Sequence, residues 1–94
     1  MRALSIIILF ALSQSAAAQE RVRTVEQYAC KDVMRESGAD RDVAIAFLHG
    51  FLIGKSGQTK FDLEMLHKQS DAFIERCLDN PAESALEAMT KVKR

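Results

Sequence analysis

Tryptophan is absent from this sequence, proline occurs once, and neither sign of charge is in excess, with 13 Lys and Arg against 13 Asp and Glu. The balanced charge argues against a nucleic-acid-binding protein, which needs a basic face to meet phosphates. The sequence also lacks a glycine-rich phosphate loop and a recognisable set of nucleophile, base and orienting group. Its histidines and cysteines do not have the spacing of a metal site. We therefore expect no enzyme, no catalytic residue, no cofactor and no metal.

The amino terminus has the pattern of a cleavable signal peptide. Arg2 precedes a ten-residue apolar run at 3–12, and small residues follow at 15–18, as a signal peptidase requires. Ten helical residues rise about 15 Å, roughly half the thickness of a bilayer core, so an uncleaved membrane anchor is the weaker alternative. We predict a signal peptide at 1–18 and a single exported domain at 19–94, located in the periplasm and without a membrane span after cleavage.

The two cysteines, Cys30 and Cys77, both lie in the exported part, and an exported chain meets an oxidising compartment. Their pairing would close 46 intervening residues into a loop, which stabilises a domain by about 4 kcal/mol in the chain-entropy model. A CxxC redox pair and a second ligand cluster for zinc are both missing. A cysteine–histidine nucleophile pair lacks a third, orienting group. We predict one structural disulfide.

Apolar residues recur at helical spacing in four segments, and no pair of strands is apparent. Residues suited to helix caps stand at the start of each segment, namely Thr24, Asp40 or the residues next to it, Asp62 and Asn80. Pro81, after the last of these, fits a first helical turn. We predict an all-α fold, a small four-helix bundle with one disulfide, whose helices cover about 24–36, 40–54, 62–78 and 80–92.

The segment at 43–53 is apolar nearly all round, which predicts a central helix that is covered on several sides. Gly50 weakens this helix, and we expect another helix to approach closely there. His49 has apolar neighbours, so we interpret it as a partly buried or interface histidine rather than a catalytic base. His67, beside Lys68, is expected to face solvent.

Three motifs stand at similar places in a known family: YACKDV at 28–33, FLHGFL at 47–52 and CLDNP at 77–81. With them and the signal peptide, the chain resembles the HdeA/HdeB family of periplasmic acid-stress chaperones over about residues 24–92. The resemblance implies a small helical protein that is dimeric and folded near neutral pH. In acid such proteins dissociate, partly unfold and hold other periplasmic proteins against aggregation. By position, Cys30 and Cys77 match the family's disulfide pair, and 43–53 its client-binding helix.

The candidate client-binding or dimer surface lies on that helix. Its members are the bulky apolar residues Phe47, Leu48, Phe51, Leu52 and Ile53. They can equally serve as core alone, and an exposed apolar surface of this size would bind unfolded protein only after the fold loosens. The expected partners are unfolded periplasmic proteins at low pH and a second copy of the chain near neutral pH.

Carboxylates at helix starts offer a route for acid to loosen the fold. Asp40, Asp62 and Glu83 stand where backbone amides and the helix dipole stabilise a negative charge. Their contribution is present above the unfolded pKa and is lost as pH falls through the folded pKa. With every carboxylate neutral and both histidines charged, residues 19–94 carry +14, which repels a compact domain. The seven acids between 62 and 87 otherwise form a solvated face.

Two functions of different classes remain. The first is an ATP-independent chaperone that acid activates to bind unfolded proteins and prevent their aggregation. The second is a constitutive periplasmic interaction module, such as an inhibitor or accessory subunit, whose phenylalanine-rich helix docks one partner at neutral pH. They differ in pH dependence and in the range of partners.

Overall fold

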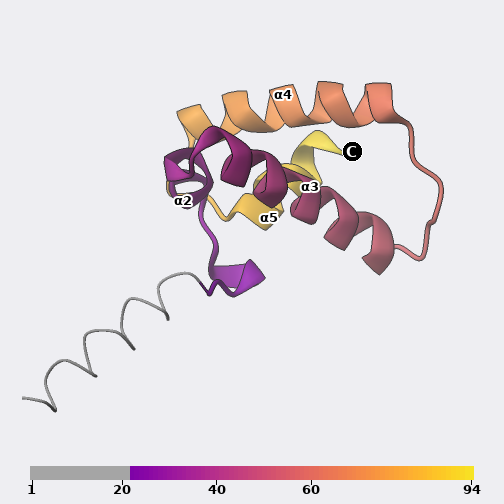
Figure 1. Cartoon of the computed structure of the whole chain (residues 1–94), viewed down its shortest axis with the longest axis horizontal. Helices are drawn as coiled ribbons and strands as arrows, with labels where there is room; N and C mark the ends of the chain where they lie inside the picture. Colours follow the sequence, from indigo (N-terminus) through magenta and orange to yellow (C-terminus); the bar gives the residue numbers. More distant parts are fainter. Residues whose placement is uncertain (1–21) are drawn as a thin grey trace, which may run out of the picture.

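The computed structural model describes residues 22–94, so the signal peptide predicted at 1–18 lies outside the described residues. A 3-10 turn, η1, precedes four helices, and the bounds are η1 (Val25–Gln27), α2 (Cys30–Arg35), α3 (Gly38–Lys55), α4 (Leu63–Asp79) and α5 (Ala85–Val92) (Figure 1). Between residues 22 and 94 no helix has the length and apolar character needed to cross a bilayer. The predicted all-α bundle of four helices with one disulfide is confirmed.

The first predicted helix is broken at Tyr28 and Ala29, both of which are extended. This part of the backbone pairs with the segment before α5 instead of continuing the helix. The Cys30 N–H donates to the Glu83 carbonyl at 2.8 Å, and the Ala85 N–H donates to the Tyr28 carbonyl at 2.8 Å. Hydrogen bonds to a distant segment therefore outweigh the local helical pattern.

The helix caps agree with the sequence only in part. The Asp62 carboxylate accepts two backbone N–H bonds at the start of α4, as predicted. Ser37, not Asp40, caps α3, and Ser84, not Asn80, caps α5. The Thr24 side chain makes no capping hydrogen bond. The helix α3 therefore begins before the predicted residue and α5 begins after it, and in each case a serine accepts the N–H three residues further on.

The short helix α5 is the centre of the fold, and α3 is not. It packs against η1, α2, α3 and α4, and its Ala85, Ala88 and Met89 are fully buried. In α3, by contrast, Val43 is 68% exposed and Phe47 52% exposed. The expectation that α3 is covered on several sides is therefore wrong.

Gly50 of α3 is also exposed, and no atom lies within 4 Å of the place where its Cβ would stand. The predicted close approach of another helix at this point is wrong. Figure 1 shows why: α4 runs along one side of the molecule, and α3 slants away from it towards the long connection between them. The carboxyl terminus of the chain lies between the two helices.

The disulfide joins Cys30, the first residue of α2, to Cys77 near the end of α4. Both cysteines are fully buried, and their Cα atoms are 4.9 Å apart. The two helices pack directly against each other, so the bond joins neighbouring helices. Around it lie the bulkiest buried side chains of the core, Phe73, Leu48, Met89 and Val33.

Candidate client-binding surface and its acid-sensitive contacts

The predicted surface residues share one helix but not one environment. Leu48 is fully buried in the core, and Leu52 packs against the core while partly buried. Phe51 and Ile53 are partly buried, whereas Phe47 is half exposed. The rings of Phe47 and Phe51 lie with centroids 5.9 Å apart and tilted by 47°. In the folded protein Phe47 is the most exposed of the five predicted surface residues, and Leu48 is the one that is fully buried.

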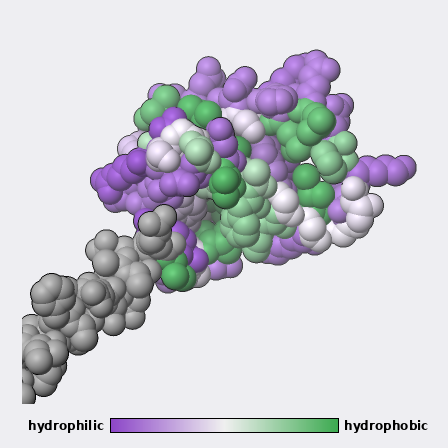
Figure 2. Space-filling model, in the orientation of Figure 1, coloured by the Kyte–Doolittle hydropathy of each residue, from purple (hydrophilic) through white to green (hydrophobic). Residues whose placement is uncertain are grey.

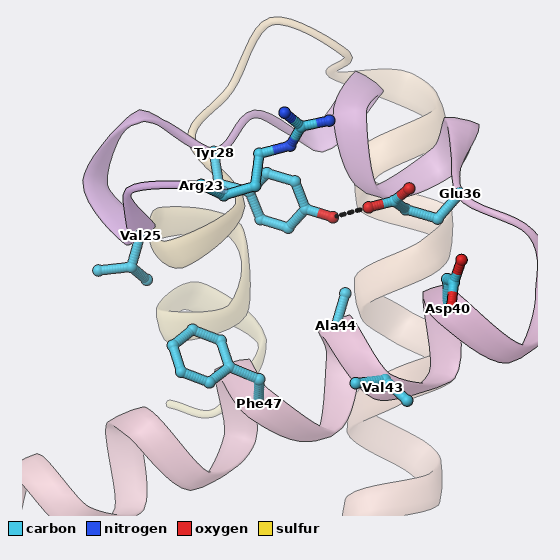
Figure 3. Close-up of a pocket in the computed structure, with 8 residues that line it drawn as sticks. All are labelled: Arg23, Val25, Tyr28, Glu36, Asp40, Val43, Ala44 and Phe47. Atoms are coloured by element: carbon cyan, nitrogen blue, oxygen red, sulfur yellow. Dashed lines mark hydrogen bonds between the residues drawn. The ribbon is translucent and has the colours of Figure 1, made fainter. Parts of the chain in front are cut away.

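A hollow of about 670 Å³ lies beside Phe47 (Figure 3). Val25, Val43 and Phe47 supply apolar walls from η1 and α3. At the other end, the Tyr28 hydroxyl donates to the Glu36 carboxylate at 2.8 Å. The hollow is thus apolar on one side and polar on the other, a shape that accepts an apolar side chain flanked by polar groups.

A second, more apolar groove of about 580 Å³ separates α3 from α4. Figure 2 shows apolar side chains gathered in this part of the molecule, where the two helices diverge. Phe61 and Leu63 are 64% and 67% exposed. The apolar side chains that line the groove are Ile45, Ala46, Ile53, Phe61, Leu63, Leu66 and Ile74.

This groove was not predicted from the sequence, although one sequence pattern indicates part of it. Phe61 stands one residue before the Asp62 cap, and Leu66 is the fourth residue of α4. These are the two positions of a hydrophobic staple, which fixes the direction in which the chain enters a helix. Both residues line the groove, so the staple pattern could have placed an apolar surface at the start of α4.

Glu83 is the most strongly held carboxylate of the described residues. Arg76 of α4 donates to its two oxygens at 2.7 and 2.9 Å, and Lys91 of α5 donates at 2.7 Å. The Glu83 side chain is only 13% exposed. The hydrogen bonds from Arg76 and then from Lys91 lower the pKa of Glu83 from 4.5 to about 2. The sequence predicted that this carboxylate belongs to a solvated acidic face, but in the structure it joins α4 to α5.

Glu83 also lies next to the disulfide in space, because its carbonyl accepts the Cys30 N–H. Of the carboxylates singled out in the sequence, Asp40 and Asp62 are exposed at the starts of α3 and α4. Only Glu83 bridges two helices. Its place before the α5 cap, rather than inside the helix, leaves its side chain free to reach both cations.

His49 is 4% exposed and lies between α3, α4 and the carboxyl terminus. Its Nε2 is 2.9 Å from the Ser70 hydroxyl and its Nδ1 is 2.9 Å from Lys93 Nζ. Burial, followed by the charge of Lys93, lowers the pKa of His49 from 6.5 to about 4. The histidine is buried, as expected. His67 is exposed on α4, also as expected, at the rim of the groove.

The part of the chain from residue 22 onward contains no group of three or more His, Cys, Asp or Glu side chains arranged to hold a metal ion. The site offers a partly apolar hollow, an apolar groove, and two buried or nearly buried groups whose charge changes in acid. Such an arrangement can alter its packing with pH and can contact apolar chains.

Comparison with known proteins gives one match. The model of the HdeA/HdeB family matches residues 1–87. Neither the curated proteins nor the solved structures contain a match. The match spans most of the sequence, including both cysteines and all of α2, α3 and α4, and it ends within the first turn of α5. The chain therefore belongs to the HdeA/HdeB family, whose members are periplasmic acid-stress chaperones rather than enzymes.

Proposed function

We propose that this protein is an ATP-independent periplasmic chaperone that acid converts into a form able to bind acid-unfolded proteins and prevent their aggregation. The observation that carries the proposal is the Glu83 contact with Arg76 and Lys91. It joins α4, α5 and the disulfide region through a charge that acid removes. Family membership supports the same function.

The direction of the pH effect follows from the pKa of Glu83, which is lowered from 4.5 to about 2 by folding. The folded state holds the carboxylate charged, so the stabilisation is fully present above pH 4.5 and is lost as pH falls towards 2. The shift corresponds to roughly 2 to 3 kcal/mol once the solvent exposure of the Lys91 ammonium is allowed for. A domain of this size has a total stability of about 5 kcal/mol, so this loss is a large fraction.

Proton uptake by the other carboxylates adds a second effect. It moves residues 19–94 towards a charge of +14, and this repulsion favours an expanded chain. The disulfide is unaffected by protons and keeps α2 tethered to α4. Expansion then makes Leu48 and the neighbouring core side chains available along with the groove between α3 and α4. Phe47, Phe51, Leu52 and Ile53 complete the proposed client surface.

Near neutral pH, we propose that a second copy of the chain covers the exposed face of α3. Val43 and Phe47 are more than half exposed there. The same exposure supports the alternative of a constitutive interaction module, in which this face docks a different protein at neutral pH. The two functions predict opposite pH profiles.

The test is light scattering of an acid-labile substrate protein, with and without this protein, from pH 7 to pH 2. The chaperone suppresses scattering at pH 2–3 and not at pH 7, and reduction of its disulfide abolishes the effect. Binding of one specific partner at pH 7, with no suppression in acid, supports the interaction module instead. A protein that stays compact and inert towards substrates at pH 2–3 is not an acid-activated chaperone.

A further inference from the structure

The last residues of the chain are fastened to both α3 and α4 through one side chain. Lys93, just after α5, donates through Nζ to His49 Nδ1 at 2.9 Å and to Gln69 Oε1 at 2.8 Å. Ser70, next to Gln69 on α4, contacts the other ring nitrogen of His49 at 2.9 Å. This cluster therefore joins α3, α4 and the end of the chain, which the disulfide does not link to one another.

The partners decide which nitrogen of His49 carries the proton. A lysine ammonium has three donors and no acceptor, so His49 Nδ1 must accept. The proton of the neutral ring is then on Nε2, which donates to the Ser70 hydroxyl. The lone pair of Nδ1 accepts the Lys93 hydrogen bond, so a second proton on the ring must break that bond. Protonation of His49 would also place two positive charges about 3 Å apart, on a ring that is only 4% exposed.

We propose that His49, Lys93 and Gln69 form an acid-released latch: protonation of His49 expels the Lys93 ammonium and frees the carboxyl-terminal end of α5 from α3 and α4. This inference deepens the proposed function and rests on it, because it supplies a step that precedes the loss of the Glu83 contact. Release uncovers Leu52 and Ile53, which line a small hollow together with Lys93 and Arg94. Both belong to the proposed client surface.

The charged and titratable groups that line the two hollows beside His49 come from three segments. Lys93 and Arg94 stand at the carboxyl terminus, Asp42 lies on α3, and His67 and Asp71 lie on α4 along the same groove. Both ring nitrogens of His49 already have partners, Ser70 and Lys93. No carboxylate among the described residues is hydrogen-bonded to the ring, so its nearest ionic neighbour is a cation. The local field therefore opposes protonation.

The latch responds to milder acid than Glu83 does. Folding lowers the pKa of His49 from 6.5 to about 4, so its contribution is present above pH 6.5 and is lost as pH falls to about 4. Over this range the opening equilibrium rises about tenfold for each pH unit. The Glu83 contribution is lost between pH 4.5 and about 2. The two groups thus act in succession as pH falls.

The experiment is hydrogen exchange of the purified, disulfide-bonded protein between pH 7 and pH 4, corrected for intrinsic exchange rates, with an NMR titration of the two histidine rings. The amides at 90–94 should lose protection about tenfold per pH unit below pH 6.5, while the core amides stay protected. Lys93→Gln keeps a donor but removes the charge. It should raise the pKa of His49 and reduce the pH-dependent loss of protection. Lys93→Arg, the matched control that keeps the charge, should retain that loss.

The latch is overturned if the amides at 90–94 keep their protection until the whole protein opens, or if Lys93→Gln titrates and exchanges like the wild type. Neither readout involves a substrate protein. Suppression of aggregation at pH 2–3 without a latch transition therefore refutes the latch and leaves the chaperone function standing. A latch transition without suppression of aggregation refutes the chaperone function.

Discussion

Replacing Glu83 by glutamine is the sharpest perturbation of the proposed mechanism. Glutamine has nearly the shape of the carboxylate but no charge, so it imitates the protonated side chain at every pH. In the folded protein Arg76 and Lys91 bind that charge with three donors, and the side chain is only 13% exposed. We expect Glu83→Gln to lower the free energy of unfolding at pH 7 by about 2 to 3 kcal/mol.

The pH dependence distinguishes this explanation from ordinary damage to packing. The wild-type protein loses the Glu83 contribution between pH 4.5 and about 2, whereas the variant has lost it already. The difference in stability should therefore shrink to near zero as pH falls through that range. Urea denaturation followed by circular dichroism at several pH values measures it.

The matched control is Glu87→Gln, which changes an exposed carboxylate in α5. It should alter stability by no more than about 0.5 kcal/mol. In the scattering assay, Glu83→Gln should begin to suppress aggregation at a higher pH than the wild type, and Glu87→Gln should not. A stability loss for Glu83→Gln that is the same at pH 7 and pH 3, or no loss at all, would refute the assignment of Glu83 as the acid-sensitive contact.

Three further outcomes are expected. Replacing both Cys30 and Cys77 by alanine removes a bond that spans 47 positions. It should lower the free energy of unfolding by about 4 kcal/mol in urea denaturation and abolish suppression of aggregation in acid. Unchanged stability together with unchanged suppression would contradict the role given to the disulfide. Leu48→Ala removes a fully buried side chain and should lower the free energy of unfolding by about 2 to 5 kcal/mol at pH 7, and an unchanged urea midpoint would contradict its place in the core. Phe47→Ser changes a half-exposed residue of α3 and should alter the free energy of unfolding by no more than about 0.5 kcal/mol. It should weaken self-association at pH 7, as measured by sedimentation velocity. Unchanged self-association would exclude this face as the dimer surface.

The sequence predicted those features that depend on local patterns. Helical spacing located the four helices, and the Asp62 cap was correct because its side chain acts on the next turn of its own helix. The disulfide followed from two cysteines in a chain whose amino terminus predicts export. Each of these inferences needs only neighbouring residues or a count.

Features set by distant contacts could not be predicted in this way. Tyr28 and Ala29 leave the helix because their backbone pairs with the segment before α5. The apolar run of α3 suggested a central helix, but the short α5 fills the centre and leaves Phe47 exposed. Periodicity reveals which residues are apolar, but not which neighbour covers them.

The acid-sensitive groups illustrate the same limit. Glu83 was identified as a helix-start carboxylate, but its lowered pKa comes from hydrogen bonds with Arg76 and Lys91, which approach from two different helices. The contact between His49 and Lys93 joins residues 44 positions apart. No spacing rule relates such positions, so the sequence could suggest a buried histidine but not its partner.

The most direct test of the central claim, that acid bares apolar surface in a chain still held by its disulfide, is binding of the dye 8-anilinonaphthalene sulfonate to the protein alone from pH 7 to pH 2. We predict little fluorescence at pH 7, a small rise between pH 6.5 and 4 as the latch opens, and a large rise between pH 4.5 and 2 with the disulfide intact. Fluorescence that stays at its neutral level down to pH 2 would contradict the account.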